Sequence, residues 1–327
     1  MSITRTNEDL SERCQVHWVN RQAFQILVFV LGANQAALAA AVYYDVTWLA
    51  VILLITGSHF MHGVLIGFHE ASHGLLRENR KFNEFDGVLI GVLSFTSFSL
   101  YRAAHQSHHV HLATEKDEEF WPFVETSAPR WLRIAAACLE LTAGLIFTPL
   151  IFFRAFVRPG TRIRNRRLRR RIWAEYGLMV VFWTAVVSTV AWLGAWKYFF
   201  WLYLGPAFIA ANLQGWRKYI EHVGLTGSTI NSSTRSIVAP GPLGRLVALT
   251  LLHEPFHGVH HQHGSLPHAE LPGHASILEP KTPEERPPFQ SYRHALVDLL
   301  RNLADPRVGP QWKRKDIGEP EELAPSR

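Results

Sequence analysis

The sequence predicts an all-α membrane protein, with four transmembrane helices in two hairpins, a cytoplasmic histidine-rich helical cap and one or two interfacial helices. Three observations support this prediction. Four stretches of 19 to 23 residues contain no Asp, Glu, Lys or Arg. Only 18% of the 327 residues are charged, against about 25% in a typical soluble domain. Many of the histidines gather in short clusters that lie outside the uncharged stretches.

The first hairpin is predicted at residues 22–68. It consists of two uncharged stretches of 23 residues, 22–44 and 46–68, separated only by Asp45. A helix of about 20 apolar residues crosses the hydrocarbon core of a bilayer, so each stretch is long enough to span it. A buried hairpin in a soluble protein is the alternative. Residues 1–21 are polar and contain Glu8, Asp9 and Glu12, unlike a cleavable signal peptide, and we assign them to a cytoplasmic N-terminal segment.

The second hairpin is predicted at residues 176–216. Its uncharged stretches, 176–196 and 198–216, contain 21 and 19 residues and are separated by Lys197. Aromatic residues are common where membrane helices meet the water interface, and four of them lie near this turn. They are Trp192, Trp196, Trp201 and Tyr203.

Two weaker apolar stretches, 87–101 and 141–153, lie between the hairpins. They contain 15 and 13 residues, which is short for a span, so we expect interfacial or re-entrant helices. The segments 69–175 and 217–280 are assigned to the cytoplasmic cap because they contain the histidine clusters. The tail, 281–327, is rich in Pro, Glu and Arg and is expected to carry little chemistry.

Positive charge predicts the orientation in the membrane. Nine arginines lie between Arg154 and Arg171, and such segments remain in the cytoplasm. The turns at Asp45 and Lys197 therefore face outside, while both termini and the histidine clusters are cytoplasmic, provided that residues 131–153 do not cross the membrane. We expect the arginine run to anchor the topology on anionic lipid, with docking of an acidic redox partner as the alternative. From Arg158 to Arg171 it has no interleaved aromatic residues, so no nucleic acid is expected.

Three histidine clusters share one spacing. His69 and His73 are four residues apart, so both imidazoles lie on one face of a helix. The other two clusters have imidazoles at i, i+3 and i+4, which a helix again directs to one side. They are His105, His108 and His109 in the second cluster, and His257, His260 and His261 in the third. Because histidine is the commonest metal ligand, the clusters predict a metal site.

Pro255 divides the histidines of the third cluster. Proline suits the first turn of a helix, where its missing N–H does no harm, so a helix starting there excludes His253. His222 is a ninth candidate ligand, because it follows the second hairpin and emerges beside the clusters. The remaining histidines near these segments are expected to be bystanders. They are His59, His62, His111 and His263.

Nine imidazoles are too many for one metal ion. A zinc ion takes three or four protein ligands, so nine suit two ions. Nitrogen-rich ligation with open positions suits iron and oxygen chemistry, although ligand type alone does not exclude zinc or manganese. The two cysteines, Cys14 and Cys138, are too few for a cysteine-rich zinc site and disfavour an iron–sulfur cluster.

Two other classes of protein are alternatives. Residues 69–73 and 253–257 match the H-E-x-x-H pattern of zinc metalloproteases. Against a membrane protease, Pro255 interrupts the helix that the second match would need, and the pattern leaves the 105–109 cluster unexplained. A metal transporter would place polar residues at mid-membrane depth, whereas these clusters lie beyond the helix ends.

The motifs resemble those of the integral-membrane fatty acid desaturases and their relatives, the membrane hydroxylases and carotenoid ketolases. The resemblance covers roughly residues 47–272. It rests on three boxes in order around a membrane hairpin, a specific signal, whereas any one box is weak. The boxes are HEASH at 69–73, HQSHH at 105–109 and HGVHH at 257–261, followed by the PHAELP segment at 267–272.

The resemblance implies a di-iron centre held by the box histidines and His222, with O2 as co-substrate. It implies desaturation of a lipid acyl chain, with hydroxylation or ketolation of a lipid or carotenoid as the alternative. The sequence has no His-Pro-Gly-Gly cytochrome b5 motif, so electrons should come from a separate ferredoxin, rubredoxin or cytochrome b5 type protein. Glu70, Glu221 and Glu254 are candidate acceptors for ligand N–H groups. The acidic run 115–119 is expected to be a solvated loop.

Overall fold

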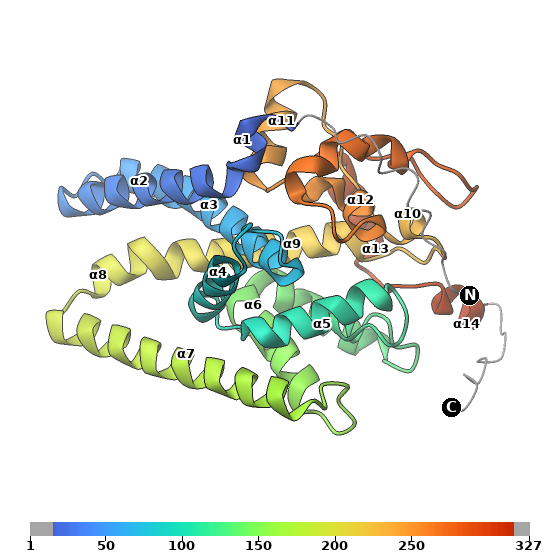
Figure 1. The fold of residues 1–327 in the computed structure, drawn as a ribbon, viewed down its shortest axis with the longest axis horizontal. Coiled ribbons are helices and arrows are strands. Elements are labelled where there is room, and N and C mark those ends of the chain that lie inside the picture. The colour runs from blue at the N-terminus through green and yellow to red at the C-terminus, as the bar shows by residue number, and fades with distance from the viewer. Residues whose placement is uncertain (1–15, 317–327) are drawn as a thin grey trace.

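Two helical hairpins extend from a cap of short helices (Figure 1). The computed structural model describes residues 16–316, which apart from one isolated bridge contain no β-structure. The first hairpin consists of α2 (Ala23–Tyr43) and α3 (Thr47–His73). The second consists of α7 (Arg166–Leu193), α8 (Trp196–Phe199), the π-helical segment η3 (Phe200–Leu204) and α9 (Gly205–His222). Both predicted hairpins are therefore present.

The turns of the two hairpins lie side by side. Lys197 Nζ donates to Asp45 Oδ1 at 2.6 Å, and the Gln35 amide donates to the Leu202 carbonyl at 3.0 Å. Both turns lie at the left of Figure 1, away from the cap. This arrangement agrees with the expectation that the two turns face the same side of the membrane.

Capping residues set the ends of the long helices. α3 continues beyond its uncharged stretch to His73 and ends at Gly74, whose φ of +79° is accessible to glycine without strain. α7 begins after Asn165, whose side chain accepts the backbone N–H groups of Arg167 and Leu168. Much of the arginine run therefore forms the first turns of α7.

Four helices of the described chain are long and apolar enough to cross a membrane: α2, α3, α7 and α6 (Arg130–Val157). The number agrees with the prediction, but the set differs. α6 has 28 residues, so the expectation that 141–153 forms a short helix is wrong. The predicted span 198–216 is helical as α8, η3 and α9, yet α9 is not in this set because its last turns carry three charged residues.

A paired charge explains the length of α6. Glu140, in the middle of the helix, accepts a hydrogen bond from Lys218 Nζ of α9. A paired carboxylate costs far less to bury than an isolated one, so the helix can continue past it. α6 bends at Ala143 (φ −134°, ψ 35°), and Asn212 Oδ1 of α9 accepts the Gly144 N–H at 2.8 Å.

The predicted stretch 87–101 forms a sharp corner. α4 (Arg80–Leu93) and α5 (Phe98–Val110) meet at 102°, as in a broken span or a re-entrant pair. The Ser97 hydroxyl at this corner donates to Glu175 of α7 at 2.6 Å. The corner is thereby fixed against the second hairpin, and α5 carries the second histidine cluster back toward α3.

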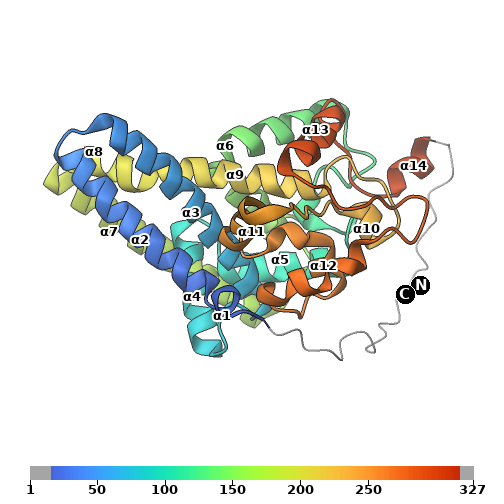
Figure 2. The same cartoon turned by 90° about the horizontal axis from the view of Figure 1, so that it is seen from above.

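The cap covers the ends of the membrane helices (Figure 2). Its elements are α1 (Trp18–Arg21), η2 (Glu118–Phe120), α10 (Ile230–Ser233), α11 (Gly241–Thr250), η4 (Glu254–Phe256), α12 (His257–Gln262), η5 (His268–Leu278), α13 (Tyr292–Asn302) and α14 (Gln311–Asp316). α13 packs against α9, and its residues Ala295 and Leu299 share a buried core with Phe123 and Tyr219. Part of the C-terminal tail therefore belongs to the cap core.

Candidate metal centre

Nine histidines from α3, α5, α9 and α12 converge where the membrane helices meet the cap. They are the nine candidate ligands of the sequence, and they form two clusters. The five-histidine cluster consists of His69, His73, His105, His109 and His260, with one ring nitrogen of each within 4.8 Å of the others. The four-histidine cluster consists of His108, His222, His257 and His261.

Ring nitrogens in the five-histidine cluster have the spacing of ligands around one ion. His105 Nε2 lies 3.1 Å from both His73 Nε2 and His109 Nε2, and His109 Nε2 lies 3.1 Å from His260 Nε2. Two nitrogens about 2.1 Å from a metal and at right angles to each other are about 3.0 Å apart. His69 Nε2 is buried and has no hydrogen-bond partner among the described residues. A metal ion would satisfy it.

The four-histidine cluster has the same local geometry. His257 Nε2 lies 2.7 Å from His222 Nε2 and 3.0 Å from His261 Nε2. His108 joins them, because its ligand atom lies within 4.8 Å of those of His222 and His261. The clusters adjoin: the ring centroids of His109 and His261, one from each cluster, are 4.3 Å apart.

Each three-histidine box serves both clusters, which the sequence did not reveal. On α5, His105 and His109 face the five-histidine cluster and His108 faces the other. On α12, His257 and His261 face the four-histidine cluster and His260 faces the other. Successive helical residues differ by about 100° in direction, so the pair at i and i+4 shares a side that the middle histidine does not. The expectation of one common face was therefore too coarse.

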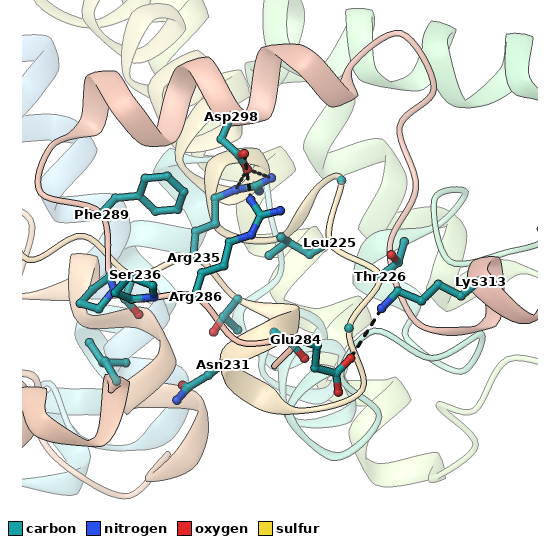
Figure 3. Close-up of a pocket in the computed structure, with 17 residues that line it drawn as sticks. Leu225, Thr226, Asn231, Arg235, Ser236, Glu284, Arg286, Phe289, Asp298 and Lys313 are labelled. Carbon is teal, nitrogen blue, oxygen red and sulfur yellow. Dashed lines mark hydrogen bonds and ion pairs between the residues drawn. The ribbon is translucent and has the colours of Figure 1, made fainter. Parts of the chain in front are cut away.

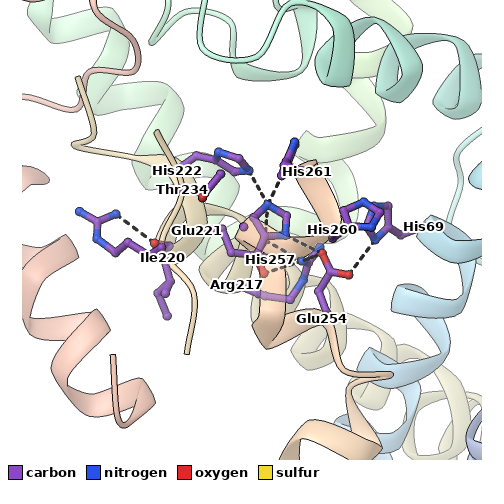
Figure 4. Close-up of polar contacts among 12 residues, drawn as sticks. His69, Arg217, Ile220, Glu221, His222, Thr234, Glu254, His257, His260 and His261 are labelled. Atoms are coloured by element: carbon purple, nitrogen blue, oxygen red, sulfur yellow. Dashed lines mark hydrogen bonds and ion pairs between the residues drawn. The ribbon is translucent and has the colours of Figure 1, made fainter. Parts of the chain in front are cut away.

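Glu254 connects the two clusters (Figure 4). Its Oε2 accepts His69 Nδ1–H at 3.0 Å, and its Oε1 accepts His257 Nδ1–H at 2.9 Å and Arg217 Nη1–H at 2.7 Å. A proton held at Nδ1 leaves Nε2 free for a metal. Burial alone would raise the pKa of Glu254, but its interactions with His69, Arg217 and His257 outweigh burial and hold that pKa well below its usual range.

Two orienting carboxylates come from the acidic run 115–119, which was expected to be solvated. Asp117 and Glu119 are buried, at 1% and 7% exposure, so that expectation is wrong for them. Asp117 Oδ2 accepts from His108 Nδ1 at 2.7 Å, and Glu119 Oε2 accepts from His105 Nδ1 at 3.0 Å. The position of the run directly after the second box was the available signal.

The other two proposed acceptors behave differently. Glu221 forms an ion pair with Arg217 at 2.6 Å and lies 3.7 Å from His257 Nε2, on the side that faces the cluster. It is therefore a candidate oxygen ligand rather than an orienting group. Glu70 is fully buried, and neither carboxylate oxygen has a hydrogen-bond partner among the described residues. It does not orient a ligand ring.

The cap histidines of the four-histidine cluster are neutral in the folded chain. Burial lowers the pKa of His257 to about 4. Burial and the neighbouring His109 hold the pKa of His261 well below its usual range. Metal ligands must be deprotonated at the binding nitrogen, so these rings are ready to bind an ion near neutral pH.

The histidines expected to be bystanders lie outside both clusters. His253 has a left-handed φ of +54° just before η4, and α12 begins only at His257, as the position of Pro255 predicted. The His253 ring instead contacts His268, with their Nδ1 atoms 3.3 Å apart. His59 Nε2 lies 2.9 Å from the Thr250 hydroxyl. Because no continuous helix joins residues 253 and 257, the two histidines of the second H-E-x-x-H motif do not lie on one helix face as a metalloprotease motif requires.

A mainly apolar cavity of about 180 Å3 lies between the membrane helices and the clusters. Its wall includes Phe68, which precedes His69, and Tyr101, whose ring stacks on His105. Residues of α3, α4, α6 and α9 form most of the remaining wall. The cavity therefore offers an apolar chain a position next to the five-histidine cluster.

A second pocket, of about 190 Å3, lies on the cap (Figure 3). It is more polar, but its charges are paired within the protein. Arg235 and Arg286 both form ion pairs with Asp298, at 2.7 and 3.2 Å, and Lys313 lies 3.5 Å from Glu284. The apolar cavity is the better candidate for a lipid chain.

The family comparison agrees with the geometry. Residues 46–293 match the family model described as fatty acid desaturase, which is close to the extent of the resemblance seen in the sequence. A search of curated proteins found no match. Membership implies an oxidoreductase of the desaturase or hydroxylase type, an integral-membrane location, a lipid substrate and metal binding. The chain belongs to the fatty acid desaturase family.

Proposed function

We propose that the protein is a membrane di-iron, O2-dependent desaturase of lipid acyl chains. The observation that carries this proposal is the pair of adjoining imidazole clusters next to an apolar cavity. The nine histidines would hold two iron ions, one in each cluster. Bound iron would supply O2 activation and removal of hydrogen from an unactivated C–H bond.

The protein's own groups prepare the ligands. Glu254, Asp117 and Glu119 hold the Nδ1 protons of four rings, two in each cluster. The Ser233 carbonyl has the same relation to His222 Nδ1, at 3.2 Å. Fixed tautomers leave the Nε2 atoms unprotonated and directed inward.

The cavity would bind the chain and exclude water. Its wall is mainly apolar, and His105, on which the wall residue Tyr101 stacks, is buried. Exclusion of water protects reactive species from side reactions and strengthens interactions with fixed polar groups. The helices that form the wall also fix which part of the chain lies nearest the clusters.

We infer that the clusters and both termini face the cytoplasm, where a separate electron-transfer protein of ferredoxin, rubredoxin or cytochrome b5 type would deliver electrons. The arginine run supports this orientation. Five of its exposed arginines form no ion pair among the described residues: Arg162, Arg164, Arg166, Arg167 and Arg170. Such a surface is suited to the cytoplasmic side of a membrane.

Metal analysis and product analysis test the proposal together. We expect two irons per chain and a lipid product with one new double bond. His108→Ala and His260→Ala, one from each cluster, should abolish product and lower bound iron. His111→Ala is the matched control, because His111 ends the same helix as His108 but lies in neither cluster. Full activity of either cluster variant, or a single bound zinc, would contradict the proposal.

Mass analysis of the product distinguishes the two types of reaction. Desaturation removes two hydrogens from the chain, whereas hydroxylation adds one oxygen. A hydroxylated or ketolated lipid or carotenoid as the sole product would retain the di-iron part of the proposal and replace the reaction.

A further inference from the structure

An ion pair lies in the wall of the apolar cavity. Lys218 and Glu140 both line the cavity, and their side chains are only 11% and 3% exposed. Lys218 Nζ donates to one carboxylate oxygen, and the Tyr219 hydroxyl donates to the other at 3.0 Å. Apolar residues of similar volume are often as stabilising as a buried ion pair. A pair at this position therefore calls for a role beyond packing.

The ammonium group of Lys218 has hydrogen-bonding capacity that the protein does not use. An ammonium has three N–H donors, and among the described residues its one acceptor is Glu140. Its other close contacts are aromatic rings: Nζ lies 5.3 Å from the Phe120 centroid and 5.8 Å from the Tyr219 centroid. The ammonium can therefore donate to a molecule in the cavity.

Lys218 also lies close to the candidate metal ligands. It precedes His222 by four residues on α9, which places both side chains on one face, about 6 Å apart along the axis. The Phe120 ring, which Lys218 contacts, also lies beside two candidate ligands. Its centroid is 4.7 Å from that of His222 and 5.3 Å from that of His108. An oxygen bound at Lys218 would therefore lie near the carbon that reacts.

We propose that Lys218 binds an uncharged oxygen of the substrate, so that the substrate is a lipid with a hydroxyl or carbonyl group in the part that enters the cavity. This rests on the proposed function, because it takes the cavity as the substrate site. Hydrogen bonds from a charged donor in apolar surroundings are strong, and one here would fix the position of the chain. Glu140 already balances the ammonium, so a carboxylate would bring a second negative charge beside it.

Binding of three chains of equal length tests this proposal. The probes are octadecane, octadecan-1-ol and octadecanoate, each displacing a fluorescent hydrocarbon from the purified full-length protein in lipid nanodiscs. We expect octadecan-1-ol to bind about tenfold or more tightly than octadecane, the range for a hydrogen bond to a charged group. We expect it also to bind more tightly than octadecanoate. Equal binding of the alcohol and the alkane, or tightest binding of octadecanoate, overturns the proposal.

Two variants assign the preference to the ammonium. Lys218→Met alone would leave the Glu140 carboxylate buried without a compensating positive charge and could prevent folding. The double variant Lys218→Met/Glu140→Gln removes both charges. Glu140→Gln alone is the matched control, because it retains Lys218 and still offers the ammonium an amide oxygen as acceptor. The control should keep the preference for the alcohol, while the double variant should lose it and bind octadecane as the wild type does. A preference that persists in the double variant overturns the assignment.

Failure of this inference is distinguishable from failure of the proposed function, because the binding assay needs neither iron nor O2. If octadecan-1-ol binds through Lys218 but the protein holds no iron, the proposed reaction fails and the binding site stands. If the protein oxidises lipid but binds octadecane and octadecan-1-ol equally, the reaction stands and the binding site fails.

Discussion

Replacing Glu254 by Gln should weaken both metal sites at once. Glu254 accepts from one ring of each cluster, His69 at 3.0 Å and His257 at 2.9 Å. A glutamine has one acceptor oxygen and one NH2 group, so Glu254→Gln can serve only one ring and directs donors at the other. The variant also removes one of the two carboxylates that form ion pairs with Arg217, and Glu221 is the other.

The magnitude follows from the role of such contacts. Loss of a partner that orients a metal-bound histidine typically costs 10- to 100-fold in metal affinity or activity, or about 1.4 to 2.7 kcal/mol. Because Glu254 serves two ligands, we expect a loss in this range at each cluster. Glu119→Gln and Asp117→Asn are the matched controls, since each carboxylate orients one ring of one cluster, His105 and His108 respectively.

Metal content after equilibration against graded concentrations of a chelator measures the effect. The Glu119 variant should release one ion early, and the Asp117 variant should release the other. The Glu254 variant should release both early while still unfolding cooperatively. If Glu254→Gln keeps both ions with wild-type affinity, or weakens only one, the bridging role is refuted.

Three further predictions concern stability and topology. In the metal-free protein, the His257 pKa of about 4 in the folded chain lies below its unfolded value of about 6.5. The contribution of His257 to the unfolding free energy is therefore constant above pH 6.5 and falls by up to about 3 kcal/mol toward pH 4. Denaturant unfolding at pH 7 and pH 4.5 measures this, and equal midpoints would contradict it. In a cysteine-free background, a cysteine replacing Asp45 should react with an impermeant thiol reagent in intact cells. A cysteine replacing Arg164 should react only after lysis. The reverse pattern of labelling would show that the proposed orientation is inverted. Gly144→Val should lower the free energy of unfolding by about 1 to 3 kcal/mol, because a Cβ there would lie 2.8 Å from a backbone carbonyl of α9. Gly177→Ala, which adds its Cβ in open space, should leave this free energy unchanged or raise it slightly. Equal melting temperatures of the two variants would count against close packing of α6 on α9.

The sequence predicted the elements that depend on local composition. Uncharged stretches of 23 residues became α2 and α3 with their turn at Asp45. The spacing of the boxes identified the histidines that converge, and Pro255 correctly separated His253 from α12. Each of these features follows from a few neighbouring residues, so one segment at a time was enough to predict it.

The sequence did not predict how the histidines divide between the clusters. A spacing of i, i+3 and i+4 fixes directions around one helix axis, but the partner of each direction depends on how the helices pack. His108 meets His222, which is 114 residues away in the chain, rather than its neighbour His109. Asp117 and Glu119 were missed for a similar reason. Acidic residues in a short polar run usually face water, and only the packing of this loop buries them.

The extents of two helices, α6 and α9, were predicted least well, and for the same reason. Glu140 made the apolar stretch of α6 look short, and the charges after residue 216 made the next span look complete there. In the structure α9 continues to His222, and its Lys218 meets Glu140 in the cavity wall. An unpaired charge is costly inside a membrane. Because Glu140 and Lys218 neutralise each other, α6 can continue through Glu140 and α9 can continue through Lys218. Hydropathy treats helices separately and cannot represent a pair that spans two of them. The same pair would make the cavity favour lipids that carry an oxygen over plain hydrocarbons, because the Lys218 ammonium can donate a hydrogen bond to an oxygen and a hydrocarbon has no acceptor.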